Sequence, residues 1–177
     1  SPSMDILVSS NLERLIFHLL GNDAAKTKEL MEKLTTEGEY TLPEVNQEIL
    51  DMFEAGYATE AETSAEIKRV YDASDYVEDP HTAVASAVYQ KYVERTGDHT
   101  PTVIASTASP YKFPRVAVEA VSGKAPADDF AAVKELEKLS GVVIPKAVDG
   151  LETAEVRHKT VVATSDMQKA VEDYLGL

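Results

Sequence analysis

The sequence predicts a single helix-rich domain of the α/β class with only a few strands. Most apolar residues recur at three- and four-residue spacing between capping residues, which is typical of amphipathic helices. Two runs rich in β-branched residues, 102–106 and 156–163, interrupt this pattern and predict strands. A turn and a helical pattern follow the first run, and this order is the signature of the class. At 177 residues and 44% apolar content, the chain is long enough for one core.

The first half of the chain is predicted to be helical. Apolar spacing predicts a helix over 12–20, which Gly21 ends, and a second helix over about 24–34. We expect the acidic helices between about 22 and 76 to form an insertion carried on the α/β framework, with their charged faces in solvent.

Two capping boxes predict the next helix starts. Thr41 and Glu44, with a proline in the first turn, predict a third helix, and Thr59 and Glu62 predict a fourth that runs to about residue 71. The apolar face of the third helix would consist of Val45, Ile49, Met52 and Phe53.

The second half alternates helices with extended segments. Asp79 followed by proline predicts a helix that Gly97 ends. Later helices are expected through 116–121, at about 128–139, and after a Ser165–Gln168 box near the end of the chain. A short extended piece is expected at 142–144.

Composition excludes several classes of partner. The net charge of −14, from 31 acidic and 17 basic residues, would repel nucleic acid and anionic lipid. No apolar run approaches the roughly 20 residues that cross a membrane. The absence of cysteine excludes disulfides and thiolate chemistry, and an ordinary reducing cytoplasm is the expected location. The four histidines fit no metal-ligand spacing, so we expect no metal.

Thr107 is the first candidate site residue. It follows the predicted strand 102–106, and ligands of open α/β sheets gather beyond the carboxyl ends of strands. A threonine hydroxyl there could bond a heterocyclic nitrogen. In the alternative interpretation, the hydroxyl bonds a loop amide or caps the next helix.

Residues at the start of the first helix form a second candidate site. Helix-start amides and hydroxyls can hold an anion, and an arginine one turn later adds charge. The alternative is an ordinary N-cap with a surface arginine. The residues concerned are Ser9, Ser10, Asn11 and Arg14.

Two further basic side chains are candidates. His81, just inside the helix opened by Asp79, could serve as acid, base or phosphate donor, or could only pack and cap. Lys112 lies in a loop, where its alternative is a solvated lysine.

At these same places the sequence resembles the threonine synthases of many bacteria and fungi. Residues 1–14 resemble that family's SPxMDIxxSSNxER segment, and residues 107–114 resemble its TAxPxKFP loop. Further matches occur at 67–71 (IKRVY) and 79–84 (DPHTAV), with a weaker match at 158–161 (HKTV). The matches occur in family order and run from one end of the chain to the other.

The resemblance implies a fold and an activity. The family converts O-phosphohomoserine and water to threonine and phosphate with pyridoxal phosphate, on the three-layer α/β/α fold (fold-type II) shared with the tryptophan synthase β subunit. Residues 1–177 are then expected to be the C-terminal portion of the catalytic domain. By this resemblance Thr107 contacts the pyridine nitrogen, as a neutral partner that makes the ring a weaker electron sink. The substrate candidates are Ser9, Ser10, Asn11, Arg14, His81 and Lys112.

The resemblance also implies what these residues lack. The family's cofactor-anchoring lysine and glycine-rich phosphate loop lie upstream of the segment matched at Ser1, so we expect no catalytic residue and no turnover in this chain alone. Lys112 belongs to the TAxPxKFP-like loop and does not replace that lysine, and Ser109 stands where many relatives carry histidine. Uncovered apolar edges are expected to cause self-association. The alternative to an enzyme portion is a stand-alone acidic helical module that binds a protein or a metabolite.

Overall fold

The structure is a computed structural model that describes Ile6 and residues 8–177. Residues 1–5 and Leu7, which open the first matched segment, lie outside the described residues. The chain divides into two compact units, 1–142 and 143–177. Each unit is described by itself.

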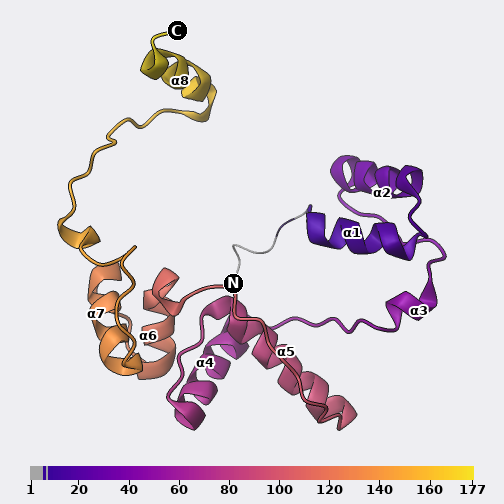
Figure 1. Ribbon diagram of the computed structural model, residues 1–177, viewed down its shortest axis with the longest axis horizontal. Helices are drawn as coiled ribbons and strands as arrows, with labels where there is room; N and C mark the ends of the chain where they lie inside the picture. Colours follow the sequence, from indigo (N-terminus) through magenta and orange to yellow (C-terminus); the bar gives the residue numbers. More distant parts are fainter. Residues whose placement is uncertain (1–5, 7) are drawn as a thin grey trace. The chain divides into compact units, whose positions relative to one another are not determined.

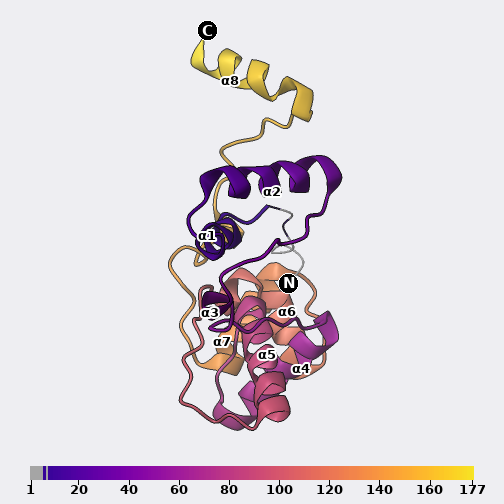
Figure 2. The ribbon, with the colours of Figure 1, turned by 90° about the vertical axis from the view of Figure 1, so that its right-hand side faces the viewer.

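The first unit begins with two packed helices, α1 (Ser10–Leu19) and α2 (Ala24–Glu37). Figure 2 looks along α1 while α2 lies across the view, so the two helices cross steeply. Ile16 and Leu19 of α1 are buried with Leu30 of α2, which confirms the apolar spacing as a packing face. The predicted helices at 12–20 and 24–34 are therefore confirmed.

The predicted helix that begins at the Thr41 capping box is wrong. The chain is irregular there, and α3 (Gln47–Leu50) is a single turn that begins after Asn46. The Asn46 N–H donates to the carbonyl of Leu19 at 2.9 Å, and its side chain accepts from Ile49 N–H at 3.3 Å. This contact with the end of α1 fixes the helix start, so a distant backbone group outweighs the local capping signal.

The two best-marked helix starts form as expected, and the two helices that they open contact each other. α4 (Glu60–Ser74) carries a complete capping box between Thr59 and Glu62, and α5 (Pro80–Thr96) begins after Asp79. Gly97 ends α5 in the left-handed conformation (φ +69°). Figure 1 shows α4 and α5 meeting at the turn that joins them.

Two later helices complete the core of the first unit. After the 3₁₀ turn η2 (Pro110–Lys112), α6 (Pro114–Ser122) packs on α4 and on α7 (Asp129–Ser140). Figure 1 shows α6 and α7 side by side. The fully buried side chains at these contacts are Ile67, Ala117, Val118, Ala132 and Leu136.

Two tyrosines bind carbonyl groups at the end of α7. The Tyr71 hydroxyl of α4 donates to the Leu139 carbonyl at 3.2 Å, and the Tyr111 hydroxyl of η2 donates to the Val142 carbonyl. The last carbonyls of a helix lack partners within the helix, so the Tyr71 hydroxyl satisfies a group of the last turn of α7, and the Tyr111 hydroxyl satisfies a carbonyl just past the Gly141 cap. Tyr111 is 4% exposed, and burial raises the pKa of its hydroxyl.

The segment before α4 is fastened along α5. Lys91 donates to the Tyr57 carbonyl at 3.0 Å, and Arg95 pairs with Glu54 at 2.6 Å. Between these contacts Gly56 lies so close to Val88 that a β-carbon on the glycine would stand 2.7 Å from Val88 Cγ1. The absence of a side chain at position 56 therefore permits this close approach.

The second unit contains η3 (Leu151–Thr153), η4 (Thr164–Asp166) and α8 (Met167–Leu175), and none of its residues is buried. The last helix forms, but the Ser165–Gln168 box is wrong, because α8 begins after Asp166 without a side-chain cap. No helix in the part of the chain that the structure describes is long and apolar enough to cross a bilayer.

The segments predicted as strands, 102–106, 142–144 and 156–163, are not strands among the described residues. A strand is defined by a hydrogen-bonded neighbour, and no described segment pairs with them. Their valines instead face solvent, with Val103 94% and Val161 93% exposed.

Candidate functional site

The start of α5 is organised by one buried aspartate. Asp79 is 1% exposed, and its Oδ1 accepts from the N–H groups of His81 at 2.9 Å and Thr82 at 3.3 Å. Its Oδ2 accepts from the Thr82 hydroxyl. Asp79 therefore holds the first turn of α5 through both carboxylate oxygens, a stronger arrangement than a single N-cap bond.

Thr82 connects this helix start to the loop that carries Thr107. Its hydroxyl is 3.1 Å from the Ser106 hydroxyl, across 24 residues of sequence. Thr82 is 5% exposed, so the bond is shielded from water on its α5 side. Ser106 directly precedes the TASPYKFP segment (107–114), so this bond places the start of that segment beside the DPHT segment.

The other end of this loop is held by aromatic and capping contacts. The Ser109 hydroxyl accepts from Tyr111 N–H at 3.2 Å and caps η2. The His81 ring meets Phe113 edge to face, with centroids 4.8 Å apart and planes at 85°. We call the α5 start and the 106–113 loop the α5–loop junction.

The predicted site residues of this junction have different surroundings. Thr107 is exposed on the loop, without a hydrogen-bond partner among the described residues, and does not stand at the end of a strand. Lys112 is exposed, and its ammonium lies 5.5 Å from the centre of the Phe113 ring. His81 and Lys112 are therefore brought together around one phenylalanine.

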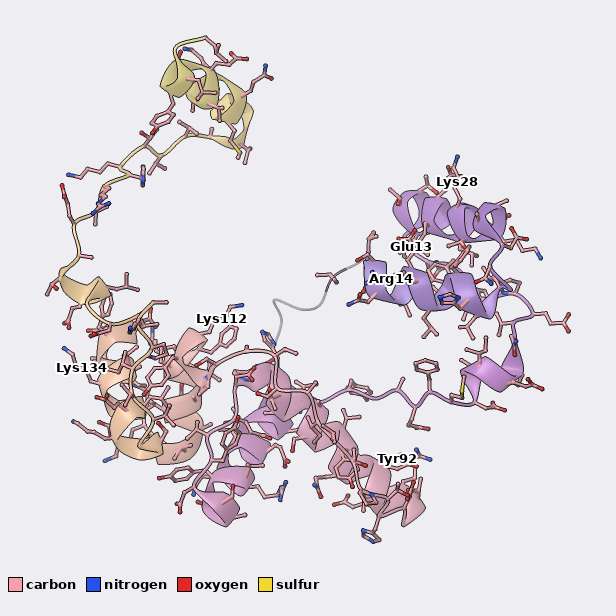
Figure 3. All side chains as sticks on the ribbon, in the orientation of Figure 1. Glu13, Arg14, Lys28, Tyr92, Lys112 and Lys134 are labelled. Atoms are coloured by element: carbon pink, nitrogen blue, oxygen red, sulfur yellow. The ribbon has the colours of Figure 1, made fainter. Side chains whose placement is uncertain are left out.

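The α1 candidates form a separate local group. Ser9 caps α1 by accepting from Leu12 N–H at a long 3.5 Å, and Arg14 donates to the Asn11 side chain. Ser10 and Arg14 line a groove of about 770 Å³ between α1 and α2, whose walls include Phe17 and Met31. Lys28 of α2 also lines this groove, and Figure 3 labels it on α2 while Arg14 lies on α1.

A buried acidic joint lies between α4 and α5. Glu66 is 6% exposed and is bound by Arg69 through Nε and Nη2, both at 2.7 Å. This pairing is the main cause that lowers the pKa of Glu66. Glu78 is also 6% exposed, and its Oε2 has no hydrogen-bond partner among the described residues. Burial, with the nearby Glu66 carboxylate, raises the pKa of Glu78 to about 7.

Sequence reasoning missed Thr82, Ser106 and Glu78. Asp79 and the proline after it predicted the helix start, but no local pattern predicts that the Thr82 hydroxyl has a partner 24 residues away. The only available signal for Glu78 was an acidic residue directly before a helix cap. Among the described residues, no group of three His, Asp or Glu side chains has the arrangement of a metal site.

Comparison with known proteins identifies the family. The sequence profile described as "Threonine synthase, C-terminal" matches residues 82–174, just over half of the chain. The threonine synthase of Pseudomonas aeruginosa is 35% identical over 128 residues, which are 72% of this chain and 27% of the relative. That of Saccharomyces cerevisiae is 33% identical over 176 residues, 88% of this chain and 33% of the relative. The chain belongs to the threonine synthase family.

Solved structures agree with this assignment. The yeast threonine synthase crystal structure matches 99% of this chain and 36% of its own, with a TM-score of 0.71 and 26% identity. A threonine synthase from Brucella melitensis, described as bound to PLP, matches 77% of this chain and 29% of its own, with a TM-score of 0.58 and 34% identity. The expected fold class, a helix-rich portion of that α/β fold, is confirmed. The chain spans about a third or less of the length of the sequence relatives above.

Proposed function

We propose that this chain is the C-terminal portion of an enzyme that converts O-phosphohomoserine and water to threonine and phosphate with pyridoxal phosphate. The observation that carries the proposal is the α5–loop junction, where the family-like segments 79–84 and 107–114 meet through His81 and Phe113, beside the Thr82–Ser106 hydrogen bond. Family membership over residues 82–174 supports the same reaction class.

Thr107, at the junction, is suited to the pyridine nitrogen of the cofactor. Thr107 offers a neutral hydroxyl that is exposed and has no partner among the described residues, which suits the single nitrogen of a pyridine ring. The cofactor, when bound, supplies an electron sink for carbanion chemistry. The role proposed for Thr107 is to hold and orient that nitrogen without giving it a full charge.

The substrate phosphate is assigned to basic and hydroxyl groups. At the start of α1, free helix amides and hydroxyls favour an anion, and Arg14 adds positive charge. At the junction, Lys112 and His81 flank Phe113 and would add charge and a donor. The residues proposed to contact substrate are Ser9, Ser10, Asn11, Arg14, His81 and Lys112.

The test uses the full-length protein that contains this chain. With pyridoxal phosphate and O-phosphohomoserine, we expect phosphate release, and no release would overturn the proposal. Thr107→Val should weaken cofactor binding and lower kcat, because the isosteric side chain keeps the volume and loses the hydroxyl. Thr107→Ser, which keeps the hydroxyl, is the matched control. The 177-residue chain alone is expected to give no turnover.

A further inference from the structure

The hydrogen bonds at the start of α5 have a fixed direction. A threonine hydroxyl has one proton, and an ionised carboxylate can only accept. The Thr82 hydroxyl therefore donates its proton to Asp79 Oδ2. Its lone pairs remain, so the bond at 3.1 Å must be donated by Ser106. The result is a directed chain in which Ser106 donates to Thr82 and Thr82 donates to Asp79.

This chain ends on a buried and rigid group. Asp79 is 1% exposed and is bound to the backbone of the first turn of α5. A charged acceptor also polarises the threonine hydroxyl and strengthens the bond that it accepts from Ser106. The hydrogen bond to Thr82 therefore holds Ser106 as rigidly as the start of α5, although the loop around Ser106 has no regular structure.

Thr107 lies between two fixed points. Ser106, on one side, is tied to α5. Ser109, on the other side, caps η2, where Tyr111 is buried and bound to the Val142 carbonyl. Consecutive α-carbons are about 3.8 Å apart, so the backbone of Thr107 cannot move far while Ser106 is held.

We infer that Asp79 and Thr82 are positioning residues, which fix the Thr107 hydroxyl through Ser106 without touching cofactor or substrate. The inference rests on the proposed function, because only that function gives Thr107 a ligand. It adds that the accuracy of the Thr107 contact depends on a buried helix cap, Asp79, that lies 28 residues earlier in the sequence.

The first measurement is backbone order at Thr107 in the full-length protein that contains this chain, by ¹⁵N relaxation. In the wild type we expect an order parameter of about 0.8 at Thr107, and in Ser106→Ala a value below about 0.6. Ser106 is exposed, so this variant keeps the fold and leaves the Thr82–Asp79 bond in place. Thr102→Ala is the matched control, because among the described residues its hydroxyl bonds only the nearby Thr100 carbonyl.

The second measurement is the pyridoxal phosphate Kd of the full-length protein. Ser106→Ala and Thr82→Val should each raise this Kd about tenfold. The Kd of the double variant should be no higher than that of Thr82→Val, because both substitutions remove the same Thr82–Ser106 hydrogen bond. Thr82→Ser keeps both hydrogen bonds and should stay within about twofold of the wild type. A purely structural role would not give this rescue together with the non-additive pair.

The failures of the two proposals are distinguishable. Unchanged order at Thr107 in Ser106→Ala, or an equal loss in Thr102→Ala, would overturn the positioning role whether or not the enzyme works. Absence of phosphate release by the wild-type full-length protein would instead remove the proposed function, and the assignment of Thr107 to a cofactor with it.

Discussion

Ser86 on α5 donates a hydrogen bond of 2.5 Å to the Glu66 carboxylate on α4, inside the contact between the two helices. Arg69 binds the same carboxylate through two nitrogens. Glu78 lies beside this group, buried, with one oxygen unpartnered. The joint between α4 and α5 thus contains one satisfied acidic group and one that is left without a full set of partners.

Burial of the Glu78 carboxyl group makes the stability of the fold fall as pH rises. Its pKa is raised from 4.5 to about 7, so the folded chain binds the proton more tightly than the unfolded chain. The stabilisation is complete below about pH 4.5 and is lost as pH rises through 7, a difference of about 3 kcal/mol at about 1.4 kcal/mol per pKa unit. Glu78→Gln stays neutral and should remove this pH dependence. Urea unfolding at pH 5, 6, 7 and 8 measures the free energy of unfolding.

The test compares the pH dependence of variants rather than reading the wild-type curve alone. Glu94→Gln, on the exposed side of α5, is the control and should keep the wild-type slope. Wild type and Glu78→Gln with parallel pH curves would contradict the burial argument.

The Ser86 bond should be worth more than an ordinary surface hydroxyl. Ser86→Ala removes a buried donor to a charged acceptor, and we expect a loss of about 2 kcal/mol in the free energy of unfolding. Ser74→Ala is the control, because that hydroxyl bonds the Val70 carbonyl in an exposed position, and its loss should be below about 0.5 kcal/mol. Equal losses would show that the α4–α5 joint does not depend on this bond.

The capping box of α4 can be tested through the titration of one residue. The pKa of Glu62 is held at about 2, chiefly by Lys91 and then by hydrogen bonds from Thr59. In Thr59→Ala the Glu62 pKa should rise but stay below 4.5, because the Lys91 ion pair at 2.7 Å remains. Loss of the cap should cost about 1 kcal/mol of stability. NMR titration of Glu62 measures the first effect, and Thr36→Ala, whose hydroxyl bonds its own helix, is the control.

How far the sequence predicts this fold depends on the range of each signal. The helix starts at Thr59 and Asp79 are set by residues within one turn, and both are as predicted. The Thr41 box has the same local pattern and fails, because the Asn46 backbone bonds the end of α1 instead. Capping residues indicate where a helix can begin, and tertiary contacts determine at which of these positions a helix does begin.

The candidate site was likewise predictable from the sequence only in part. The segments carrying His81 and Thr107 are recognisable in the sequence, but their meeting through Thr82 and Ser106 is a tertiary contact. The three strand predictions are wrong because β-branched runs mark a segment suited to a sheet, whereas a strand also needs a neighbour. The helical insertion over about 22–76 stays a prediction.

The glycine beside Val88 offers a test of close packing. Gly56→Ala should destabilise the fold by about 1–3 kcal/mol, because the new β-carbon would stand 2.7 Å from a stiff, branched side chain. Val88→Ala removes the obstructing atoms. In the double variant the cost should be smaller than the sum of the single costs, as measured by urea unfolding. Strict additivity would mean that the segment moves away without strain.

The exposed valines should make the isolated chain associate. Val103 and Val161 are each more than 90% exposed, in segments whose backbone has no paired neighbour among the described residues. Sedimentation should show concentration-dependent association, and Val161→Lys should reduce it. Glu172→Lys also introduces a lysine, but outside these segments, and is the control. A monomer at all concentrations would contradict the expectation.

The two tyrosine hydroxyls at the end of α7 impose an order on how this unit assembles. Tyr71 reaches the Leu139 carbonyl across 68 residues and Tyr111 reaches the Val142 carbonyl across 31. Until α4 and η2 have docked, the Leu139 carbonyl in the last turn of α7 and the Val142 carbonyl just past its cap lack these tyrosine partners, so we expect the end of α7 to be less stable in an early species. Synthesis from the ribosome adds α7 after both tyrosines, which means that its last turn can lock as soon as it emerges.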